Sequence, residues 1–129
     1  MTNVLYSPGR EGFLDGTIDW DTAVFKAALV RGYTFSAAHK FVSDVTDAGG
    51  TLVATSAALG SKTVTDGIAD AADITWSAVA TGAACPYIVI FQASAVSGGA
   101  DVAASAQRVV AFIDTATGLP VTPNGGDIT

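Results

Sequence analysis

Residue types that carry catalytic chemistry are scarce in this chain. General acid–base catalysis and metal binding use imidazoles, thiolates and carboxylates that the fold brings together. The 129 residues include one histidine, His39, one cysteine, Cys85, and one glutamate, Glu11. The sequence therefore predicts no catalytic residue, no cofactor-binding residue and no metal ligand, and we expect that the protein is not an enzyme.

The aspartates form the two groups that come nearest to a site. Asp66, Asp70 and Asp73 could supply oxygen ligands to a cation such as Ca²⁺, but their spacing is not that of an EF-hand loop. Asp19 and Asp21 form a pair of carboxylates, which is the equipment of glycoside hydrolases. Two residues apart on an extended segment, they point the same way and cannot straddle a bond. We interpret both groups as solvated carboxylates of turns and loops.

The other polar candidates have simpler structural interpretations. His39 has no second histidine or cysteine near it, and the sequence lacks a Gly-x-Ser-x-Gly motif, so we expect a surface or half-buried side chain. Gly118, Gly125 and Gly126 are turn formers with no helix after them, unlike a phosphate-binding loop. Cys85 stands at the start of an apolar run and is predicted to be a small buried residue.

Four aromatic residues leave two alternatives open. Trp20, Trp76, Tyr87 and Phe91 could form a platform on which sugars or bases stack. They could equally belong to the core, where an aromatic side chain buries about 150–250 Å². We favour the core, because a small β domain needs such residues to fill its interior.

Composition and charge exclude several classes of partner. Twelve acidic residues against six basic ones give a net charge of −6. The basic residues are scattered singly: Arg10, Lys26, Arg31, Lys40, Lys62 and Arg108. Because nucleic-acid binding needs clustered positive charge, direct contact with DNA or RNA is not expected. The sequence has no apolar run of roughly 18 residues and no signal-peptide pattern at its start, so we expect no membrane contact and synthesis in the cytoplasm.

Hydrophobic periodicity predicts short strands with one or two short helices. One helix is predicted from Ser7 to Gly16, and another at Ser36–Val45, where apolar residues recur at spacings of three and four. Strands are predicted at Thr22–Val30, Thr51–Thr55, Lys62–Thr65, Ile74–Ala78, Tyr87–Phe91 and Arg108–Asp114. Asp66-Gly67 is the strongest turn signal, and Ser94–Ser105 is predicted to be a long loop.

Two of these strands indicate where the core lies. Tyr87–Phe91 has no polar face, which indicates a central strand covered on both sides. Ile74–Ala78 alternates, with Ile74, Trp76 and Ala78 predicted to face inward. Short strands at regular spacing, without long helices between them, predict one mainly β domain over residues 1–129. The expected architecture is an antiparallel β-sandwich or a jelly-roll-like barrel with one or two short helices.

Several stretches together resemble a known family. They are Gly9–Trp20, Phe25–Val30 with Tyr33–Phe35 and Phe41–Val45, and Phe112–Ile128, of which the last is the most specific. The likeness covers most of the chain and includes Lys62–Val64 and Ala72–Trp76. The family is that of small virion structural proteins encoded in the structural gene modules of tailed bacteriophages.

This resemblance implies a non-enzymatic component of a phage particle. The role that it implies first is a capsid decoration, or cement, protein on the outside of the capsid; a tail or head-tail connector component is the alternative. Its expected partners are the major capsid protein or other virion proteins, and further copies of this chain in a homo-oligomer. Only 14% of the residues are charged, which also indicates that a partner covers part of the surface. A receptor- or carbohydrate-binding tail module would instead need exposed aromatic residues, and a small hydrolase or metal protein would need a bound ion.

Three segments are predicted to make the contacts, because we expect them to be exposed and flexible. They are Thr2–Asp15, Ser36–Val45 and Ser94–Ser105. On this basis, deletion of Thr2–Pro8 is expected to weaken particle binding and leave the fold intact. In the family that the chain resembles, the stretch Asn124–Thr129 leads into a further strand. We therefore expect an edge of the sheet to be capped by the chain's own termini or paired with a neighbouring protein.

Overall fold

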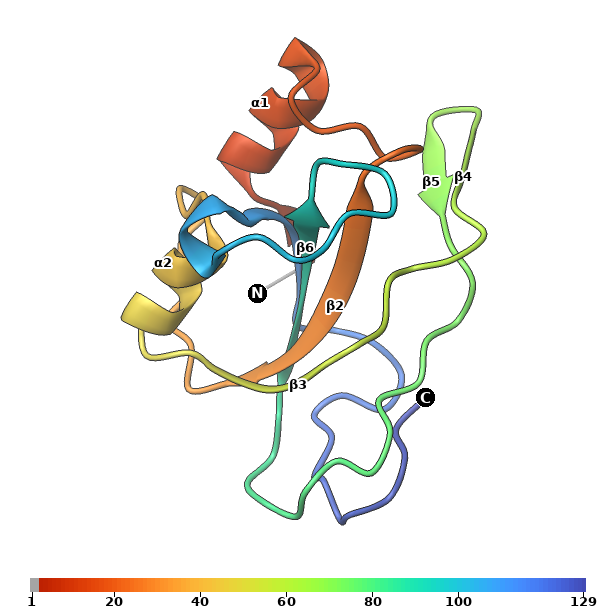
Figure 1. Ribbon diagram of the computed structural model, residues 1–129. Coiled ribbons are helices and arrows are strands. Elements are labelled where there is room, and N and C mark those ends of the chain that lie inside the picture. Colours follow the sequence, from red (N-terminus) through yellow and green to blue (C-terminus); the bar gives the residue numbers. More distant parts are fainter. Residues whose placement is uncertain (1–2) are drawn as a thin grey trace.

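A five-stranded antiparallel sheet is the centre of the structure, a computed structural model that describes residues 3–129 (Figure 1). In spatial order the strands are β1 (Val4–Leu5), β7 (Arg108–Ile113), β6 (Tyr87–Ser94), β2 (Val24–Arg31) and β3 (Thr51–Thr55). The other elements are the helices α1 (Ser7–Asp15) and α2 (Val42–Asp47), a 3₁₀ turn at Ala104–Ala106, and a hairpin of β4 (Thr63–Thr65) and β5 (Ile68–Asp70). The predicted mainly β, antiparallel fold with short helices is confirmed, and within residues 3–129 the sheet stays open and does not close into a barrel.

The apolar strand β6 lies between β7 and β2, in the central position that its sequence predicts. Its two faces are covered unequally. Val89 and Phe91 are buried on one face, whereas Ile88 and Ile90 are half-buried on the other. The expectation that β6 is covered on both sides is therefore confirmed for the first face and only partly for the second, where Ile88 and Ile90 pack against a smaller cluster.

The face of the sheet that carries Val89 and Phe91 holds the main core, and we call it the closed face. Residues of β2, β6 and β7 pack there with α2 and with two tyrosines. The buried members are Tyr6, Ala28, Val30, Tyr33, Val42, Val45, Val89, Phe91, Ala93, Val109 and Phe112. The rings of Phe35 and Phe112 stack with their centroids 4.3 Å apart. One continuous cluster therefore fills this side of the sheet.

The opposite face, which we call the open face, carries two separate small clusters. They are Ile18, Ala23, Phe25 and Val110 at one end of the sheet, and Ala27, Leu29, Trp76, Val79 and Cys85 at the other. Between the clusters lie Ile90 and Ala111, which are cross-strand partners on β6 and β7 and are both half-buried. The described chain thus covers the two ends of this face and leaves its middle partly uncovered.

Helix α1 packs closely on β7. It ends at Gly16, as predicted, with the left-handed φ of 83° that commonly terminates helices. Gly9 allows the close approach, because a Cβ there would lie 2.9 Å from the backbone oxygen of Val109. Just before the helix, the backbone N–H of Tyr6 donates to the oxygen of Val110 over 3.0 Å. The first turns of the chain are thereby fixed to the sheet.

The second helix is shorter than predicted and begins later. The periodicity predicted a helix at Ser36–Val45, but α2 is Val42–Asp47. Asp44 explains the start, because its carboxylate accepts the backbone N–H groups of Lys40 and Phe41, each over 2.9 Å. Phe41 itself forms a β-bridge to Arg108, which holds the preceding residues in an extended conformation. Capping and pairing to the sheet therefore override the helical spacing.

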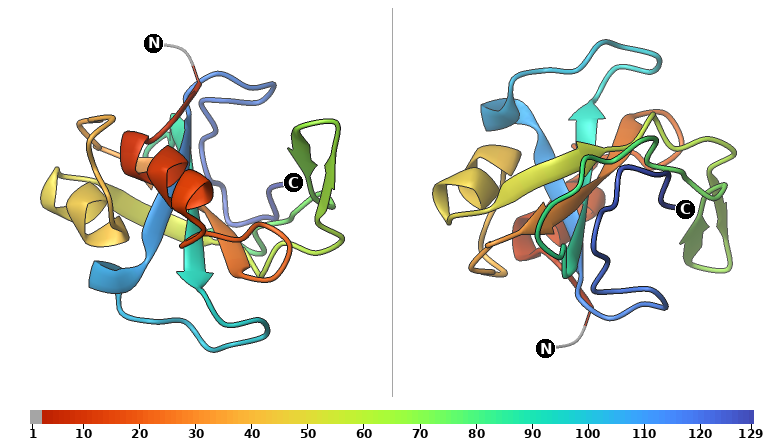
Figure 2. Two further views of the ribbon diagram at one scale, coloured as in Figure 1. Left: turned by 90° about the horizontal axis from the view of Figure 1, so that it is seen from above. Right: turned by 90° about the horizontal axis from the view of Figure 1, so that it is seen from below.

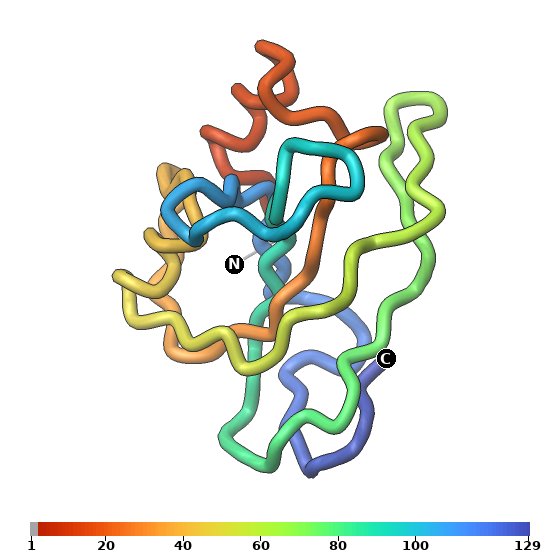
Figure 3. Tube along the Cα trace, viewed as in Figure 1, coloured from red at the N-terminus to blue at the C-terminus, as the bar shows by residue number. Residues whose placement is uncertain are grey.

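The predicted strand at Ile74–Ala78 is replaced by isolated pairing with the end of the chain. Trp76 forms a β-bridge with Ile128, and Cys85 forms another with Val121. Ala78 is exposed with a positive φ of 47°, and Val79 is buried in its place. In Figure 3 the segment that contains Trp76 and Cys85 (green) runs beside the C-terminal segment (blue) in the lower part of the molecule. Trp76 is therefore buried and Ile74 is half-buried against the same cluster, as the alternation predicted, whereas Ala78 does not face inward.

The β4–β5 hairpin, residues 63–70, projects beside the sheet, and we call it the arm (Figure 2). Asp66 and Gly67 both have positive φ, 52° and 77°, as a two-residue hairpin turn requires. The turn is thus where the sequence predicted it, although β5 was not predicted. Every residue of β4 and β5 is exposed.

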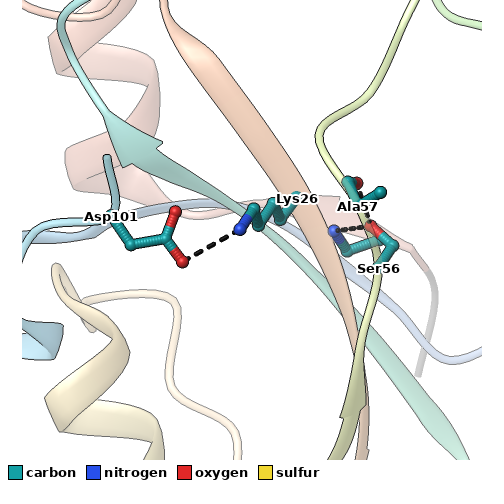
Figure 4. A network of polar contacts seen from close by, with 5 residues as sticks. Lys26, Ser56, Ala57 and Asp101 are labelled. Atoms are coloured by element: carbon teal, nitrogen blue, oxygen red, sulfur yellow. Dashed lines mark hydrogen bonds and ion pairs between the residues drawn. The ribbon is translucent and has the colours of Figure 1, made fainter. Parts of the chain in front are cut away.

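Polar contacts tie two loops to β2, as Figure 4 shows. The ammonium of Lys26 lies 2.9 Å from the carboxylate of Asp101, which holds the predicted long loop after β6 on the closed face. The hydroxyl of Ser56 accepts the backbone N–H of Ala27 and donates to the oxygen of Ala57. These contacts fix the chain where it leaves the sheet.

The two edges of the sheet are finished differently. The β7 edge is covered by the chain's own N-terminal strand, because Val4 and Leu5 pair with Phe112 and Ala111. This is one of the two arrangements expected from the sequence. The other edge is β3, whose register with β2 shifts so that Val53 has no partner in the ladder. Val53 thus forms a one-residue irregularity in the edge strand.

Candidate functional site

The uncovered middle of the open face is the floor of an apolar groove. Ile90 and Ala111 form this floor, and Ile90 lines both of two adjoining cavities. The first cavity has a volume of about 380 Å³ and lies between the sheet, α1 and the arm. The second has a volume of about 460 Å³ and extends toward Trp76 and Ile74. We call this pair of cavities the groove.

Apolar side chains from distant parts of the sequence form the walls of the first cavity. They are Leu5, Phe13, Trp20, Val64 and Val110, together with small residues of the arm. Three of these side chains are exposed, since Val64 is 54% exposed, Leu5 42% and Phe13 37%, whereas Val110 is buried. On the arm, Ile68 is 68% exposed. Grouped exposed apolar residues of this type mark interaction sites more often than isolated ones do.

One carboxylate lines the groove, and four more are next to lining residues in the sequence. Asp19 and Asp21 flank the lining residue Trp20, while Asp66 and Asp70 stand next to the lining residues Gly67 and Ala69. A fifth carboxylate, Asp73, lines the second cavity. All five aspartates are exposed. Among residues 3–129, Asp73 is thus the one ionisable side chain that lines either cavity of the groove.

The nearest basic side chain is already engaged. Lys62, at the base of the arm, donates to the backbone oxygen of Ala23. Its ammonium also lies 5.1 Å from the ring centre of Phe25 and 6.0 Å from that of Trp20. The indole N–H of Trp20 in turn donates to the oxygen of Thr63 over 3.2 Å. Lys62 and Trp20 thus anchor the arm to the body, and the positive charge of Lys62 stays beside Trp20.

The aspartates that sequence analysis considered as ligands act locally in the backbone. Asp70 accepts the N–H of Ala71 over 2.8 Å, and Asp19 accepts the N–H of Asp21 over 3.0 Å. Asp66 occupies the hairpin turn. Residues 3–129 contain no group of three or more histidine, cysteine, aspartate or glutamate side chains arranged to hold a metal ion.

His39 belongs to a hydrogen-bonded chain that enters the closed face. Its Nδ1 lies 2.6 Å from the hydroxyl of Tyr33, which lies 3.0 Å from the hydroxyl of Tyr6. Burial raises the pKa of both phenols above the ordinary value, and the hydrogen bond between them raises that of Tyr6 further. His39 is half-buried, as expected, and its position in this chain is structural.

The remaining sequence candidates also have structural positions. Cys85 is fully buried, as predicted, and burial raises the pKa of its thiol. Trp76 and Phe91 are buried, which agrees with a core role, while Trp20 and Tyr87 are half-buried. Because these four aromatic residues belong to different clusters and loops, they do not form one exposed platform.

The three segments predicted to make contacts differ in how much of each is exposed to solvent. In the first, Thr2 lies outside the described residues, and Tyr6 is fully buried in the closed face. Deletion of Thr2–Pro8 would therefore damage the fold, and the expectation that it leaves the fold intact is wrong. In Ser36–Val45, Val42 and Val45 are buried. The loop Ser94–Ser105 is the most exposed of the three and presents Val96.

Comparisons with protein families, with curated proteins and with solved structures find nothing that matches this chain. The resemblance to phage virion proteins accordingly stays a prediction. Among residues 3–129, no helix is long and apolar enough to cross a membrane.

Sequence analysis missed the groove because its parts are far apart in the chain. The arm, however, left a signal: Asp66-Gly67 is followed by Ile68, Ala69 and Asp70, which can pair residue by residue with Thr65, Val64 and Thr63. A two-residue turn of this type requires a strand on each side. The hairpin could therefore have been predicted, whereas its position opposite Ile90 could not.

Proposed function

We propose that this protein is a structural component of a tailed-phage virion, and specifically a decoration protein on the outer surface of the capsid. It would bind the major capsid protein or another virion protein, associate with further copies of itself, and make or break no covalent bond. The observation that carries this proposal is the groove, an apolar surface on the open face with an arm beside it.

The distribution of polar groups supports a binding role over a catalytic one. Most side chains that line the groove are apolar, and the one carboxylate among them, Asp73, is exposed. The histidine and the cysteine lie elsewhere, in the closed face and in the cluster around Trp76. A catalytic site would require ionisable groups that converge on one bound molecule.

The mechanism would be stabilisation through repeated burial of apolar surface. Each square ångström of apolar surface removed from water contributes about 25 cal/mol before the cost of association. A single groove is small compared with the roughly 800 Å² per partner of a stable protein complex. Copies arranged on a closed shell would multiply modest contacts, because each bound copy raises the effective concentration of the next contact.

Immunogold labelling of purified phage particles tests the proposal. Antibodies against this chain are expected to label the head shell at regular spacing, and mass spectrometry of the same particles should detect the chain in many copies. Label confined to the tail or the neck would favour the tail or connector alternative. Absence of the chain from particles, with the protein free in the lysate, would overturn the proposal.

A further inference from the structure

Two buried polar atoms without a hydrogen-bond partner belong to neighbouring residues of the sheet. Among residues 3–129, the buried side-chain nitrogen and oxygen atoms that lack a partner are Nε of Arg108 and Oε1 of Gln92. Arg108 on β7 and Gln92 on β6 lie directly opposite each other. Residues paired in this way place their side chains on the same face of the sheet, with Cβ atoms about 4.5–5.5 Å apart. The two atoms therefore lie in the same region of the interior.

This region lies on the open face, beneath α1. The partner of Gln92 on β2 is Phe25, which belongs to the small cluster at that end of the sheet. Helix α1 comes close here, because a Cβ on Gly12 would lie 2.4 Å from Cδ1 of Ile18 and 3.1 Å from a terminal nitrogen of Arg108. Gln92 is 5% exposed, and neither orphaned atom is reached by bulk water.

The terminal nitrogens of the Arg108 guanidinium hold α1 to the sheet. One donates to the backbone oxygen of Pro8 over 2.6 Å, and the other donates to the hydroxyl of Thr17 over 3.4 Å. Pro8 is in the first turn of α1, and Thr17 follows the end of the helix. Arg108 therefore joins both ends of α1 to β7. These bonds leave the N–H of Nε for a different acceptor.

The chemistry of the two orphaned atoms defines what can bridge them. Nε of an arginine is a donor, and Oε1 of a glutamine is an acceptor. A bridging molecule must therefore accept one hydrogen bond and donate another. A chloride ion or a carboxylate can only accept, and an ammonium group can only donate. A hydroxyl group does both. Water is the smallest molecule that carries one, and folded proteins hold about one buried water per 27 residues at such unsatisfied groups.

We infer that one internal water molecule binds between Arg108 and Gln92, accepting from Nε and donating to Oε1. A buried donor on a charged group is costly when it stays unpaired, whereas a bridging water is nearly as favourable in enthalpy as a direct hydrogen bond. The water completes the hydrogen bonding of the guanidinium that joins α1 to the sheet. Because α1 carries Phe13 of the groove wall, the water also helps to fix that wall. The inference does not depend on the proposed function.

NMR of the ¹⁵N-labelled protein in water tests the inference. The arginines of the chain are Arg10, Arg31 and Arg108, and Arg108→Lys identifies the Nε–H signal of Arg108 by its loss. We expect this N–H to exchange with solvent about tenfold or more slowly than that of the exposed Arg10. We also expect it to show cross-peaks to water with opposite signs in NOE and ROE spectra. Opposite signs indicate a bound water, whereas chemical exchange gives equal signs.

Matched substitutions of two buried glutamines locate the water. Gln92→Leu removes the acceptor, so it should abolish the water cross-peak of Arg108 and raise the equilibrium constant of unfolding by roughly tenfold. Gln107→Leu is the control, because Gln107 is also buried but has no orphaned side-chain atom. This variant should leave the cross-peak unchanged. If Gln92→Leu does not fold, the spectra of the unaltered protein still decide whether the water is bound.

Three outcomes would overturn the inference. Slow exchange of the Arg108 Nε–H without a water cross-peak would show that Gln92 accepts this hydrogen bond directly. Exchange as fast as that of Arg10 would show that bulk water reaches Nε. A saturable shift of the Arg108 signal on addition of sodium chloride, absent from the signals of Arg10 and Arg31, would show that an anion occupies the position.

Discussion

The closed face and the open face belong to the same three central strands, yet their coverage differs. On the closed face, one continuous cluster contains buried residues of β2, β6, β7 and α2 together with Tyr6 and Tyr33. The hydroxyls of these two tyrosines are hydrogen-bonded. On the open face, two smaller clusters leave Ile90 half-buried between them. The difference indicates that the chain obtains most of its stability from one side of the sheet. The other side can then present apolar surface without endangering the fold.

Truncation of one phenylalanine on each face gives the largest expected contrast. Phe112→Ala, at a residue that is 1% exposed, should lower the free energy of unfolding by about 3–5 kcal/mol, because it leaves a cavity in the closed face. Phe13→Ala, in the wall of the groove, should cost less than about 1 kcal/mol. Urea unfolding followed by circular dichroism measures both. Equal losses would show that the groove wall is part of the core.

Alkaline pH should weaken the closed face through its buried phenols. The pKa values of Tyr6 and Tyr33 are raised in the folded protein, so these groups keep their protons where the unfolded chain, with a pKa of about 10, loses them. Their stabilising effect is complete below pH of about 10 and declines as the pH rises further, by about 1.4 kcal/mol per pH unit for each retained proton. Tyr6→Phe should make this decline shallower. An unfolded tyrosine titrates between about pH 9 and 11. Parallel stability curves for the two proteins over this range would show that Tyr6 does not cause the decline.

The helix cap on the closed side should have an intermediate effect. Backbone N–H groups of Phe41 and Lys40 hold the pKa of Asp44 below its usual range. Asp44→Ala removes this acceptor and should cost about 1 kcal/mol of unfolding free energy at neutral pH. Because the folded pKa is lowered, the contribution is present above the unfolded pKa of about 3.9 and disappears as the pH falls through the folded value. Asp47→Ala, at the other end of α2, serves as the control and should change stability by less than about 0.5 kcal/mol.

Changes on the arm should have the smallest effect on stability. Val64→Ser and Ile68→Ser alter exposed residues, so each should change the free energy of unfolding by no more than about 0.5 kcal/mol. Both should reduce the fluorescence of an uncharged apolar dye such as Nile red, because less apolar surface then remains exposed on the arm. Leu14→Ser is the matched control for exposure and should leave the dye signal from the groove unchanged. A loss of several kcal/mol would mean that the arm stabilises the fold.

Local patterns predicted the elements whose residues act through their neighbours in sequence. α1 with its end at Gly16, the strand Thr51–Thr55 and the Asp66-Gly67 turn all agree with the structure. In these places backbone preference and hydrophobic alternation indicate the same conformation. The mainly β class followed from the same patterns.

The elements that differ depend on contacts between distant residues. The helix expected from Ser36 is delayed because Phe41 bridges to Arg108. The strand expected at Ile74 gives way because Trp76 pairs with Ile128 across a gap of about fifty residues. The groove is of the same kind, since its floor, walls and arm come from regions spread over the whole described chain. Sequence analysis singled out Trp20 and Asp73, which line the groove, but had no signal that places them beside Ile90.

The irregularity at Val53 affects whether the β3 edge can pair with other protein chains. Strand β3 is short, uncharged and free of proline, which makes its outer edge a template on which other chains could polymerise. Because Val53 has no partner opposite it, the strand is bent and cannot offer a flat ladder of hydrogen-bonding groups. Many copies of a protein with such an edge can lie close together without pairing edge to edge, whereas copies with a regular edge could assemble into fibrils.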